Sequence, residues 1–280
     1  MKVISGIAEL KKELNPYYSA NNSIGLVPTM GALHKGHLSL VEEAEKGDDI
    51  IVVSVFVNPT QFNDPADLER YPRTLNKDLE LLSKHEVDIV FAPSVEEMYP
   101  DVDTRIFDLA PLDSVMEGKY RPGHFNGVAQ IVSKLFEVVS PDRAYFGQKD
   151  FQQVAIIKKM VSLMKSDIEI ITCPIIRESD GLAMSSRNQL LNTEERNAAP
   201  LINKVLQEST EMVGLKEPEE VKKYVTEKIN THPLMKLDYF EIVDIQSLMP
   251  IQRWGDSDNK IGCIAVHLGN VRLIDNRFFH

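Results

Sequence analysis

Short apolar runs alternate with amphipathic stretches over the first third of the chain. The runs at residues 23–28, 49–57 and 87–93 are almost continuously apolar and predict strands. The segments between them, residues 37–47 and 75–86, place apolar residues at helical spacing. Strands without polar alternation are typical of a parallel sheet whose two faces are both covered by helices. The pattern therefore predicts the order strand, helix, strand, helix, strand.

The same alternation returns later in the chain. Residues 126–140 and 151–165 have helical spacing, and the apolar runs 143–147 and 167–176 predict two more strands. Parallel strands joined by helical crossovers form a doubly wound sheet. We therefore predict an α/β fold, with a doubly wound, Rossmann-like parallel sheet in a domain over residues 1–184.

The last third of the chain has a different pattern. Residues 193–213 and 218–232 have helical spacing, whereas three apolar runs follow one another near the C-terminus. Gly269 and Asn270, between the last two runs, favour a hairpin turn because both residues tolerate positive φ. The pattern predicts a smaller C-terminal α+β domain over residues 185–280, placed to cover the site of the first domain.

The composition is that of a globular protein. Hydrophobic residues make up 43% and charged residues 26% of the 280 residues, and no apolar run reaches the length of about 18 residues that a membrane helix needs. We therefore expect a cytoplasmic protein without a membrane partner. The formal charge of -11 argues against broad nucleic-acid binding, which needs basic patches. Cys173 and Cys263 form no CxxC pair and are expected in the core of a protein from a reducing compartment.

Two histidines lie in the loop that follows the first of these apolar runs, in the stretch GLVPTMGALHKGHLSL. In a doubly wound sheet such a loop leads into a helix N-terminus, where free N–H groups and the helix dipole favour anions. Gly31 and Gly36 would let a phosphate approach the backbone closely. An imidazole of His34 or His37 could then donate a hydrogen bond to that phosphate during phosphoryl or nucleotidyl transfer.

Three other interpretations of His34 and His37 stay open at this point. A zinc site would need further ligands, and the chain has no second Cys/His cluster. A dinucleotide site would need the GxGxxG pattern, which the loop lacks. The two histidines could also merely begin a helix and face water, because short motifs often match by chance.

Two later loops offer further donors to an anion. Ser185, Ser186 and Arg187 follow the last predicted strand of the sheet, and their hydroxyl and guanidinium groups suit phosphate oxygens. The alternative is a loop before the next helix with a solvent-facing arginine. Lys149 and Asp150 begin another helix after a strand. Because the helix dipole disfavours a cation at a helix start, Lys149 makes sense there if it meets an anion.

Amide side chains lie near the ends of other predicted strands. Asn58 and Gln61 follow the second strand and could bind a hydroxyl and a carboxylate without adding charge, although a turn-rich surface loop is the alternative. Gln152 and Gln153 are further candidates for a polar substrate contact, and one of them is expected to face solvent. His124 precedes a helix and could be either a functional group or a buried structural partner.

The order of these motifs resembles known proteins. PTMGALHKGH and MSSRN resemble the HxGH and KMSKS-type signatures of the nucleotidyltransferase superfamily, which binds ATP with these two loops. SVFVNPTQF, YPRTLNKDL, YRPGHFNGV, YFGQKDFQQ and RESDGLAMSSRN look like the pantothenate synthetase family, also called pantoate–β-alanine ligases. The likeness covers nearly the whole chain and is strongest between residues 25 and 188.

The resemblance implies a Rossmann-like fold of the nucleotidyltransferase type and a two-step ligation. ATP and the carboxylate of (R)-pantoate would give pantoyl adenylate and pyrophosphate, and the amine of β-alanine would then displace AMP to give pantothenate. The resemblance further implies ATP as a substrate, Mg²⁺ as a cofactor and a homodimer as the assembly. Such a reaction needs no covalent enzyme intermediate, which agrees with the lack of a nucleophile signature in the sequence.

The resemblance also implies roles for individual positions. It makes His37 a proton donor, Gln61 a contact of pantoate and β-alanine, and Gln153 a contact of pantoate, whereas Asn58 is a substrate candidate from its amide alone. The groups expected to neutralise charge in the transition state are His34, His37, Lys149, Ser185, Ser186 and Arg187. The implied ATP-binding positions are Met30, Gly31, Ala32, Leu33, His34, Lys35, Gly36, His37, Gly147, Gln148, Lys149, Asp150, Ile176, Met184, Ser185, Ser186 and Arg187.

Some features depart from the simplest pattern of the superfamily. The second signature usually carries lysines, whereas MSSR has a single arginine, so Lys149 is expected to supply the missing cation. Gln148 stands where many relatives carry Glu. Asp78 is a candidate Mg²⁺ ligand, although this ion often binds chiefly through nucleotide phosphates and water.

Two other functions compete with the ligase. A plain nucleotidyltransferase would release pyrophosphate and keep a nucleotidylated product, and a nucleotide-sensing module would bind ATP without turnover. An aminoacyl-tRNA synthetase shares both signatures, but the chain is short and acidic and lacks a basic domain for tRNA.

Overall fold

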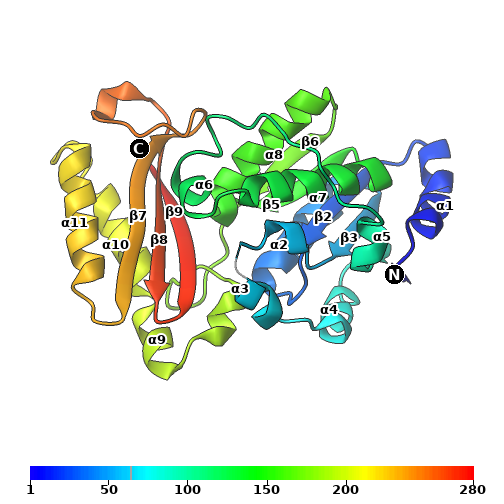
Figure 1. Ribbon diagram of the computed structural model, residues 1–280, viewed down its shortest axis with the longest axis horizontal. Helices are drawn as coiled ribbons and strands as arrows, with labels where there is room; N and C mark the ends of the chain where they lie inside the picture. Colours follow the sequence, from blue (N-terminus) through cyan, green and yellow to red (C-terminus); the bar gives the residue numbers. More distant parts are fainter. Residues whose placement is uncertain (64) are drawn as a thin grey trace.

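The larger of two sheets has six parallel strands (Figure 1). The computed structural model describes residues 1–63 and 65–280. The strands are β1 (Lys2–Ile4), β2 (Ile24–Thr29), β3 (Ile50–Val55), β4 (Ile89–Phe91), β5 (Arg143–Gly147) and β6 (Glu169–Cys173). The predicted doubly wound parallel sheet is confirmed. β1 is an addition to the predicted strands, because its three residues are too few to form a recognisable apolar run.

The strand order β1-β4-β3-β2-β5-β6 changes direction between β2 and β5. From β2 the chain moves outward through β3 and β4, and from β5 it moves outward to β6 on the other side. The loops that leave the carboxyl ends of β2 and β5 therefore turn away from each other and open a crevice between them. In open α/β sheets this switch point is the usual place of the ligand site.

Helices cover both faces of the larger sheet. The main ones are α1 (Ile7–Ser19), α2 (Lys35–Gly47), α4 (Leu75–Leu82), α7 (His124–Val139) and α8 (Phe151–Met164). Neighbouring strand residues point to opposite faces, so Leu26 shares a core with α1, α7 and α8, while Val27 shares one with α2 and α4. Shorter turns of helix lie in the connections: η1 (Pro59–Gln61), α3 (Pro65–Arg70), α5 (Val95–Met98), α6 (Met116–Tyr120), η2 (Gln148–Asp150) and η3 (Ser186–Leu190).

The C-terminal part is a second, smaller sheet with its own helices. The antiparallel strands β7 (Met235–Asp244), β8 (Lys260–Leu268) and β9 (Val271–Phe279) follow α9 (Thr193–Ala198), α10 (Leu201–Thr210) and α11 (Pro218–Asn230), with η4 (Trp254–Asp256) between β7 and β8. The hairpin turn is confirmed, and Gly269 has a φ of 57. The helical prediction over residues 193–213 is confirmed as two helices, because Pro200 separates α9 from α10 and cannot donate the backbone hydrogen bond that a continuous helix needs.

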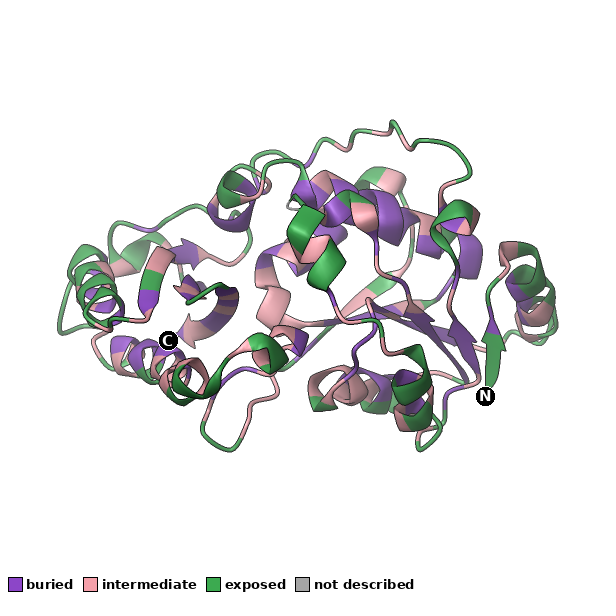
Figure 2. Cartoon of the chain, turned by 60° about the horizontal axis from the view of Figure 1, so that its bottom comes forward, coloured by how far each residue is buried: buried purple, intermediate pink, exposed green. Residues whose placement is uncertain are grey.

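The second sheet packs between its own helices and the first part of the chain. Ile242 and Ile264 point into a core with α10 and α11, whereas Val243 and Cys263 join the core that contains α7 and α8. Figure 2 accordingly shows buried residues on the strands and helices of both parts. Cys173 and Cys263 are both free and buried, as expected. None of the helices in the described part of the chain combines the length and the apolar character that crossing a bilayer requires.

Candidate active site

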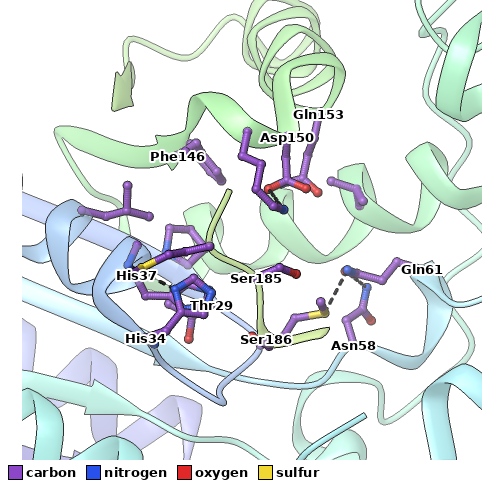
Figure 3. Close-up of a pocket in the computed structure, with 18 of the residues that line it drawn as sticks. Thr29, His34, His37, Asn58, Gln61, Phe146, Asp150, Gln153, Ser185 and Ser186 are labelled. Atoms are coloured by element: carbon purple, nitrogen blue, oxygen red, sulfur yellow. Dashed lines mark hydrogen bonds and ion pairs between the residues drawn. The ribbon is translucent and has the colours of Figure 1, made fainter. Parts of the chain in front are cut away.

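A cavity lies at the switch point of the larger sheet (Figure 3). It brings together most of the residues that the sequence singled out. Those that line it are Met30, His34, Gly36, His37, Asn58, Gln61, Gly147, Lys149, Asp150, Gln153, Ile176, Met184, Ser185, Ser186 and Arg187. Gly31, Ala32, Leu33, Lys35 and Gln148 are neighbours of lining residues but do not line the cavity themselves. In Figure 3 the histidines and the pair Asn58 and Gln61 lie at opposite ends, with Ser185 and Ser186 between them.

The two histidines form the N-terminal cap of α2. The Nδ1 atom of His34 accepts a hydrogen bond from the Gly36 backbone N–H at 3.1 Å, and that of His37 accepts one from the His34 backbone N–H at 3.3 Å. This is a reciprocal capping box with imidazoles in place of the usual hydroxyl and carboxylate. Because each Nδ1 accepts a hydrogen bond, the proton of each neutral ring is on Nε2.

The environment keeps both imidazoles neutral. Burial lowers the pKa of His34 to about 4, and the nearby Lys149 adds to the shift. Burial also holds the pKa of His37 well below its usual value, and His34 and Lys149 act in the same direction. The ring centroids are 4.1 Å apart, so two charges there would repel each other. The site therefore presents two neutral N–H donors at a helix N-terminus, rather than two cations.

Asp78 has a different position from the one that the sequence suggested. Its carboxylate accepts hydrogen bonds from the backbone N–H groups of Ala32 at 3.0 Å and Leu33 at 2.8 Å, and it is only 1% exposed. It does not line the cavity. The expectation that Asp78 binds Mg²⁺ is therefore corrected, because its two oxygens serve the loop between β2 and α2. Gly31 in this loop has a φ of +78, and a Cβ there would lie 3.1 Å from the Asp78 carboxylate.

The serine and arginine loop forms the opposite wall of the cavity. The buried Ser186 hydroxyl donates to the carbonyl of Ala32 at 3.0 Å and so joins this loop to the histidine loop. Ser185 caps η3 by accepting from the Arg187 backbone N–H. The Arg187 guanidinium binds the Asp67 carboxylate at 2.9 Å and lies 5.6 Å from the centre of the Tyr71 ring. The two signatures, far apart in sequence, thus meet through a direct hydrogen bond.

Lys149 is the second cation at this end of the cavity. Its Nζ lies 3.4 Å from the carboxylate of Asp150, with the lysine side chain 19% and the aspartate side chain 45% exposed. The pair lies in η2, between the carboxyl end of β5 and the start of α8 at Phe151. Such a loose and partly exposed ion pair is worth little by itself, so Lys149 is free to turn to an incoming anion.

Gln61 and Asn58 have unequal roles. The Asn58 side chain donates to Gln61 Oε1 at 3.1 Å and to the Gly127 carbonyl at 3.2 Å, and its Oδ1 accepts from the Tyr99 hydroxyl at 2.8 Å. It is 1% exposed and its amide is already fully engaged. Among the described residues, Gln61 Nε2 has only the Met30 sulfur as an acceptor, at 3.0 Å. Gln61 can therefore still donate to a ligand, whereas Asn58 orients Gln61.

A second set of contacts fixes the backbone of Gln61. Its backbone carbonyl accepts from His124 Nδ1 at 2.7 Å, and the other nitrogen of that ring lies 3.1 Å from Arg121. Burial, reinforced by Arg121, lowers the pKa of His124 to about 4, so the ring is neutral with its proton on Nδ1. His124 is thus a structural partner of the site, which was one of the two interpretations of the sequence.

The structure also separates the two glutamines of α8. Gln152 is buried, its amide donates to the carbonyls of Leu112 and Val115, and its Oε1 accepts from the Glu117 backbone N–H. Gln153 lines the cavity. Gln153 is therefore the one available to a ligand.

Sequence reasoning missed one wall of the cavity and one aromatic side chain. The wall consists of Val128, Ile131, Val132 and Leu135 on α7, and Tyr71 lies near Arg187. The apolar residues carry no signal of their own in the sequence, because a helix facing a cavity and a helix facing a core have the same spacing. A metal could be held only weakly by protein atoms: among the described residues no three His, Cys, Asp or Glu side chains form a cluster, and Asp150 is the only carboxylate in the cavity lining.

Fold and site together define a class of protein. A doubly wound parallel sheet with a histidine-capped helix start and an MSSR loop that line one cavity at its switch point is an α/β protein with a Rossmann-like sheet. The sequence pattern described as pantoate-beta-alanine ligase matches residues 2–278. The chain belongs to the pantoate-beta-alanine ligase family.

Individual relatives agree along nearly their full length. A pantothenate synthetase from Porphyromonas gingivalis is 55% identical over 276 residues, which cover 99% of this chain and 98% of the relative. The crystal structure of pantothenate synthetase from Thermus thermophilus superposes with a TM-score of 0.94 at 41% identity and covers 100% of both chains. The pantoate-beta-alanine ligase of Francisella tularensis, crystallised with beta-gamma ATP and beta-alanine, has a TM-score of 0.82 at 34% identity, with 99% of this chain and 97% of that chain covered.

Proposed function

We propose that this chain ligates (R)-pantoate with β-alanine at the expense of ATP, giving pantothenate, AMP and pyrophosphate through pantoyl adenylate. The observation that carries the proposal is the family match over residues 2–278, together with a cavity that contains both nucleotidyltransferase signatures and a separate amide-lined end. The relative from Francisella tularensis was crystallised with an ATP ligand and β-alanine, which supports the same two substrates here.

In the first step a pantoate carboxylate oxygen attacks the α-phosphorus of ATP and pyrophosphate leaves. Negative charge grows on the phosphates, and donors held in place beforehand stabilise it without reorganisation. We assign this task to the Nε2–H groups of His34 and His37 and to the N-terminus of α2. The donor role that the resemblance implies for His37 is here that of a hydrogen-bond donor, because its neutral ring keeps the Nε2 proton. Lys149, Ser185, Ser186 and Arg187 line the same cavity and provide the cations and hydroxyl groups.

Pantoate has a carboxylate, two hydroxyl groups and an apolar dimethyl carbon, and the far end of the cavity offers a partner for each kind of group. Gln61 and Gln153 present amides to the polar groups. The apolar residues of α7 suit the two methyl groups, because contact there removes apolar surface from water. Asn58 acts through Gln61, since its own amide is engaged.

In the second step the neutral amine of β-alanine attacks the carbonyl carbon of the adenylate. The new C–N bond replaces the bond between the carbonyl carbon and the phosphate oxygen, AMP leaves with that oxygen, and the amine passes one proton to solvent water. Holding adenylate and amine together in one cavity accounts for much of the rate that such a step needs. Bound Mg²⁺ would neutralise phosphate charge, and Asp150 would hold it together with the phosphates and water.

The remaining features complete the proposal. We infer a cytoplasmic location, which the two free, buried cysteines support, because such thiols suit a reducing compartment. We infer two domains, residues 1–184 and 185–280, since β6 ends at Cys173 and the helices of the second sheet begin at Thr193. We infer a homodimer, supported by the unusually exposed side chains of Val102 (87%) and Ile106 (88%).

The test is a product assay with purified protein. ATP, pantoate and β-alanine together should yield AMP, pyrophosphate and pantothenate in equal amounts. Pyrophosphate release without AMP, even with β-alanine, would instead indicate a plain nucleotidyltransferase. ATP binding without pyrophosphate release at any pantoate concentration would indicate a nucleotide sensor and would refute the ligase.

A further inference from the structure

Two adjacent residues of the C-terminal sheet reach into the loops that form the ATP end of the cavity. Asp275 and Asn276 lie on β9 and are 4% and 2% exposed. Neither Asp275 nor Asn276 is among the described residues that line the main cavity. They instead line a smaller neighbouring cavity, which shares Lys149, Asp150 and Gln153 with the main one. Their position is therefore behind the site, at the seam between the two sheets.

Asn276 holds the loop that carries Lys149. Its Nδ2 donates to the backbone carbonyl of Gln148 at 2.9 Å and to that of Lys149 at 3.0 Å. Its Oδ1 accepts from the side chain of Gln148 at 3.0 Å. A single buried amide thus has all its strong partners in η2, the turn that places the lysine at the carboxyl end of β5.

Asp275 holds the other wall. Its carboxylate forms a two-pronged ion pair with Arg177, at 2.6 Å and 2.9 Å. Arg177 also donates to the Gly181 carbonyl at 3.1 Å and pairs with Ala183 in an isolated β-bridge. The segment fixed in this way runs directly into Met184, whose backbone N–H donates to the Ile176 carbonyl at 3.0 Å. Asp275 therefore anchors the base of the serine and arginine loop.

We propose that Asp275 and Asn276 are positioning residues that set the separation between the Lys149 turn and the 184–187 loop around ATP. The inference rests on the proposed ATP-binding role of those two loops. A strand is stiff, and neighbouring residues on it keep a fixed spacing, so two buried contacts from one strand fix two loops relative to each other. Transition-state stabilisation depends on such fixed donor positions, and a displacement of about 1 Å can cost about 10²-fold in rate.

The experiment measures pantoate-dependent pyrophosphate release at saturating β-alanine, so that the enzyme turns over, in a double-mutant cycle of Asn276→Ala and Lys149→Ala. Lys149→Ala keeps the backbone carbonyl that Asn276 binds, so the cycle isolates the effect on the lysine side chain. Asn276→Ala should raise the KM for ATP and lower kcat, together by about tenfold or more in kcat/KM, with the KM for pantoate changed much less. In the Lys149→Ala background the same substitution should have little further effect, because the group that it misplaces is gone.

Two further variants complete the design. Asp275→Asn keeps the shape of the side chain and weakens the Arg177 ion pair, while its Oδ1 can still accept from the Asn276 backbone N–H. It therefore tests the second wall even if Asn276→Ala does not fold. It should raise the KM for ATP at least about fivefold through the misplaced 184–187 loop. Tyr120→Phe is the matched control, because the Tyr120 hydroxyl donates to the Asp238 carbonyl across the same seam without touching either loop. It should leave both constants unchanged.

The outcomes separate this inference from the proposed function. Two outcomes would overturn the inference alone, provided that Lys149→Ala lowers activity. In the first, Asn276→Ala lowers kcat/KM by the same factor in the Lys149→Ala background as in the native protein. In the second, Asn276→Ala and Asp275→Asn both leave KM and kcat unchanged. A Lys149→Ala protein with native adenylation would refute the proposed role of Lys149 and, with it, the inference. A Tyr120→Phe protein with the same loss as Asn276→Ala would assign the effect to general loosening of the seam and would also overturn the inference.

Discussion

At the scale of single residues, the site depends on which atoms carry protons. The backbone N–H groups of Gly36 and His34 occupy the Nδ1 atoms of His34 and His37, so that only Nε2–H is left for a ligand. Burial then prevents a second proton from binding at neutral pH. An imidazole in this state donates one directed hydrogen bond, and it has its geometry before the nucleotide arrives.

Replacing His37 tests this directly. We expect His37→Ala to keep the fold and to lower the rate of adenylation by about 10² or more, because one preorganised donor to the transition state is lost. Single-turnover pyrophosphate release measures the rate. Glu42→Ala, an exposed substitution on the same helix, is the control and should have native kinetics. Native adenylation in the His37→Ala protein would remove His37 from the mechanism.

A second residue-scale prediction concerns pH and the buried His124. Its pKa is lowered to about 4 in the folded protein, from the ordinary 6.5 of the unfolded chain. Between these values the unfolded chain binds more protons, so stability that is present above pH 6.5 is lost as the pH falls toward 4. The shift corresponds to about 3 kcal/mol at most. His124→Asn keeps a donor but cannot titrate there, so its urea-unfolding free energy should fall less between pH 7 and pH 4 than that of the native protein. Equal losses in the two proteins would contradict the assignment.

At the scale of elements, the loop between β2 and α2 depends on a residue from a different helix. Asp78 in α4 accepts from the backbone N–H groups of Ala32 and Leu33 and from the Thr74 hydroxyl. Gly31 can enter its left-handed conformation beside that carboxylate because it has no Cβ. Hydrogen bonds with two side chains therefore fix the loop that carries the first signature. Asp78 accepts from its backbone N–H groups, and Ser186 donates to its Ala32 carbonyl.

The revised role of Asp78 leads to a prediction. Asp78→Asn replaces one acceptor by a donor that faces a backbone N–H, which should lower the free energy of unfolding by about 1–3 kcal/mol. The Mg²⁺ concentration for half-maximal activity should stay the same, since Asp78 does not line the cavity. Denaturant unfolding and a Mg²⁺ titration of activity measure the two quantities. Native stability with a tenfold higher Mg²⁺ requirement would restore Asp78 as a metal ligand.

The sequence predicted most elements of this fold because their signals are local. Apolar runs marked β2 to β6, and helical spacing marked α2, α4, α7 and α8. The differences have equally local causes. β1 contains only three residues, and helical spacing alone does not show that Pro200 divides residues 193–213 into α9 and α10.

The candidate site was predictable only in part. Residues on loops after strands, such as His37 and Arg187, could be found because the fold brings strand ends together. The roles of Asp78 and Asn276 could not be found, because they follow from hydrogen bonds to backbone atoms that only the three-dimensional arrangement defines. Asn58 has the right place but a fully engaged amide, and no sequence pattern records which partners a side chain already has.

At the scale of the whole molecule, one surface segment exposes two β-branched apolar side chains among charged residues. Residues 101–108 run extended over α7, with Asp103 and Arg105 turned inward as an ion pair at 2.7 Å, whereas Val102 and Ile106 point outward. Alternation of this kind is typical of a strand that has one covered and one open face. Exposed β-branched residues in such a row fit the inferred homodimer, whose interface would bury them.

We therefore predict that Val102 and Ile106 lie in the dimer interface. Sedimentation velocity of the native protein should give the mass of two chains, and the double variant Val102→Asp, Ile106→Asp should give the mass of one. Leu215→Asp changes a side chain that is 81% exposed before α11 and is the matched control. Unchanged dimers in the double variant would place the interface elsewhere.

The central claim is that the cavity joins a carboxylate to the α-phosphate before the amide bond forms, and isotope transfer tests it most directly. With pantoate labelled by ¹⁸O in its carboxylate, the adenylate route leaves one labelled oxygen in each AMP, because the bridging oxygen departs with the phosphate. Mass spectrometry of the AMP formed with ATP and β-alanine measures the transfer. We predict one ¹⁸O per AMP and none in pyrophosphate. Unlabelled AMP, or label in inorganic phosphate, would contradict the account.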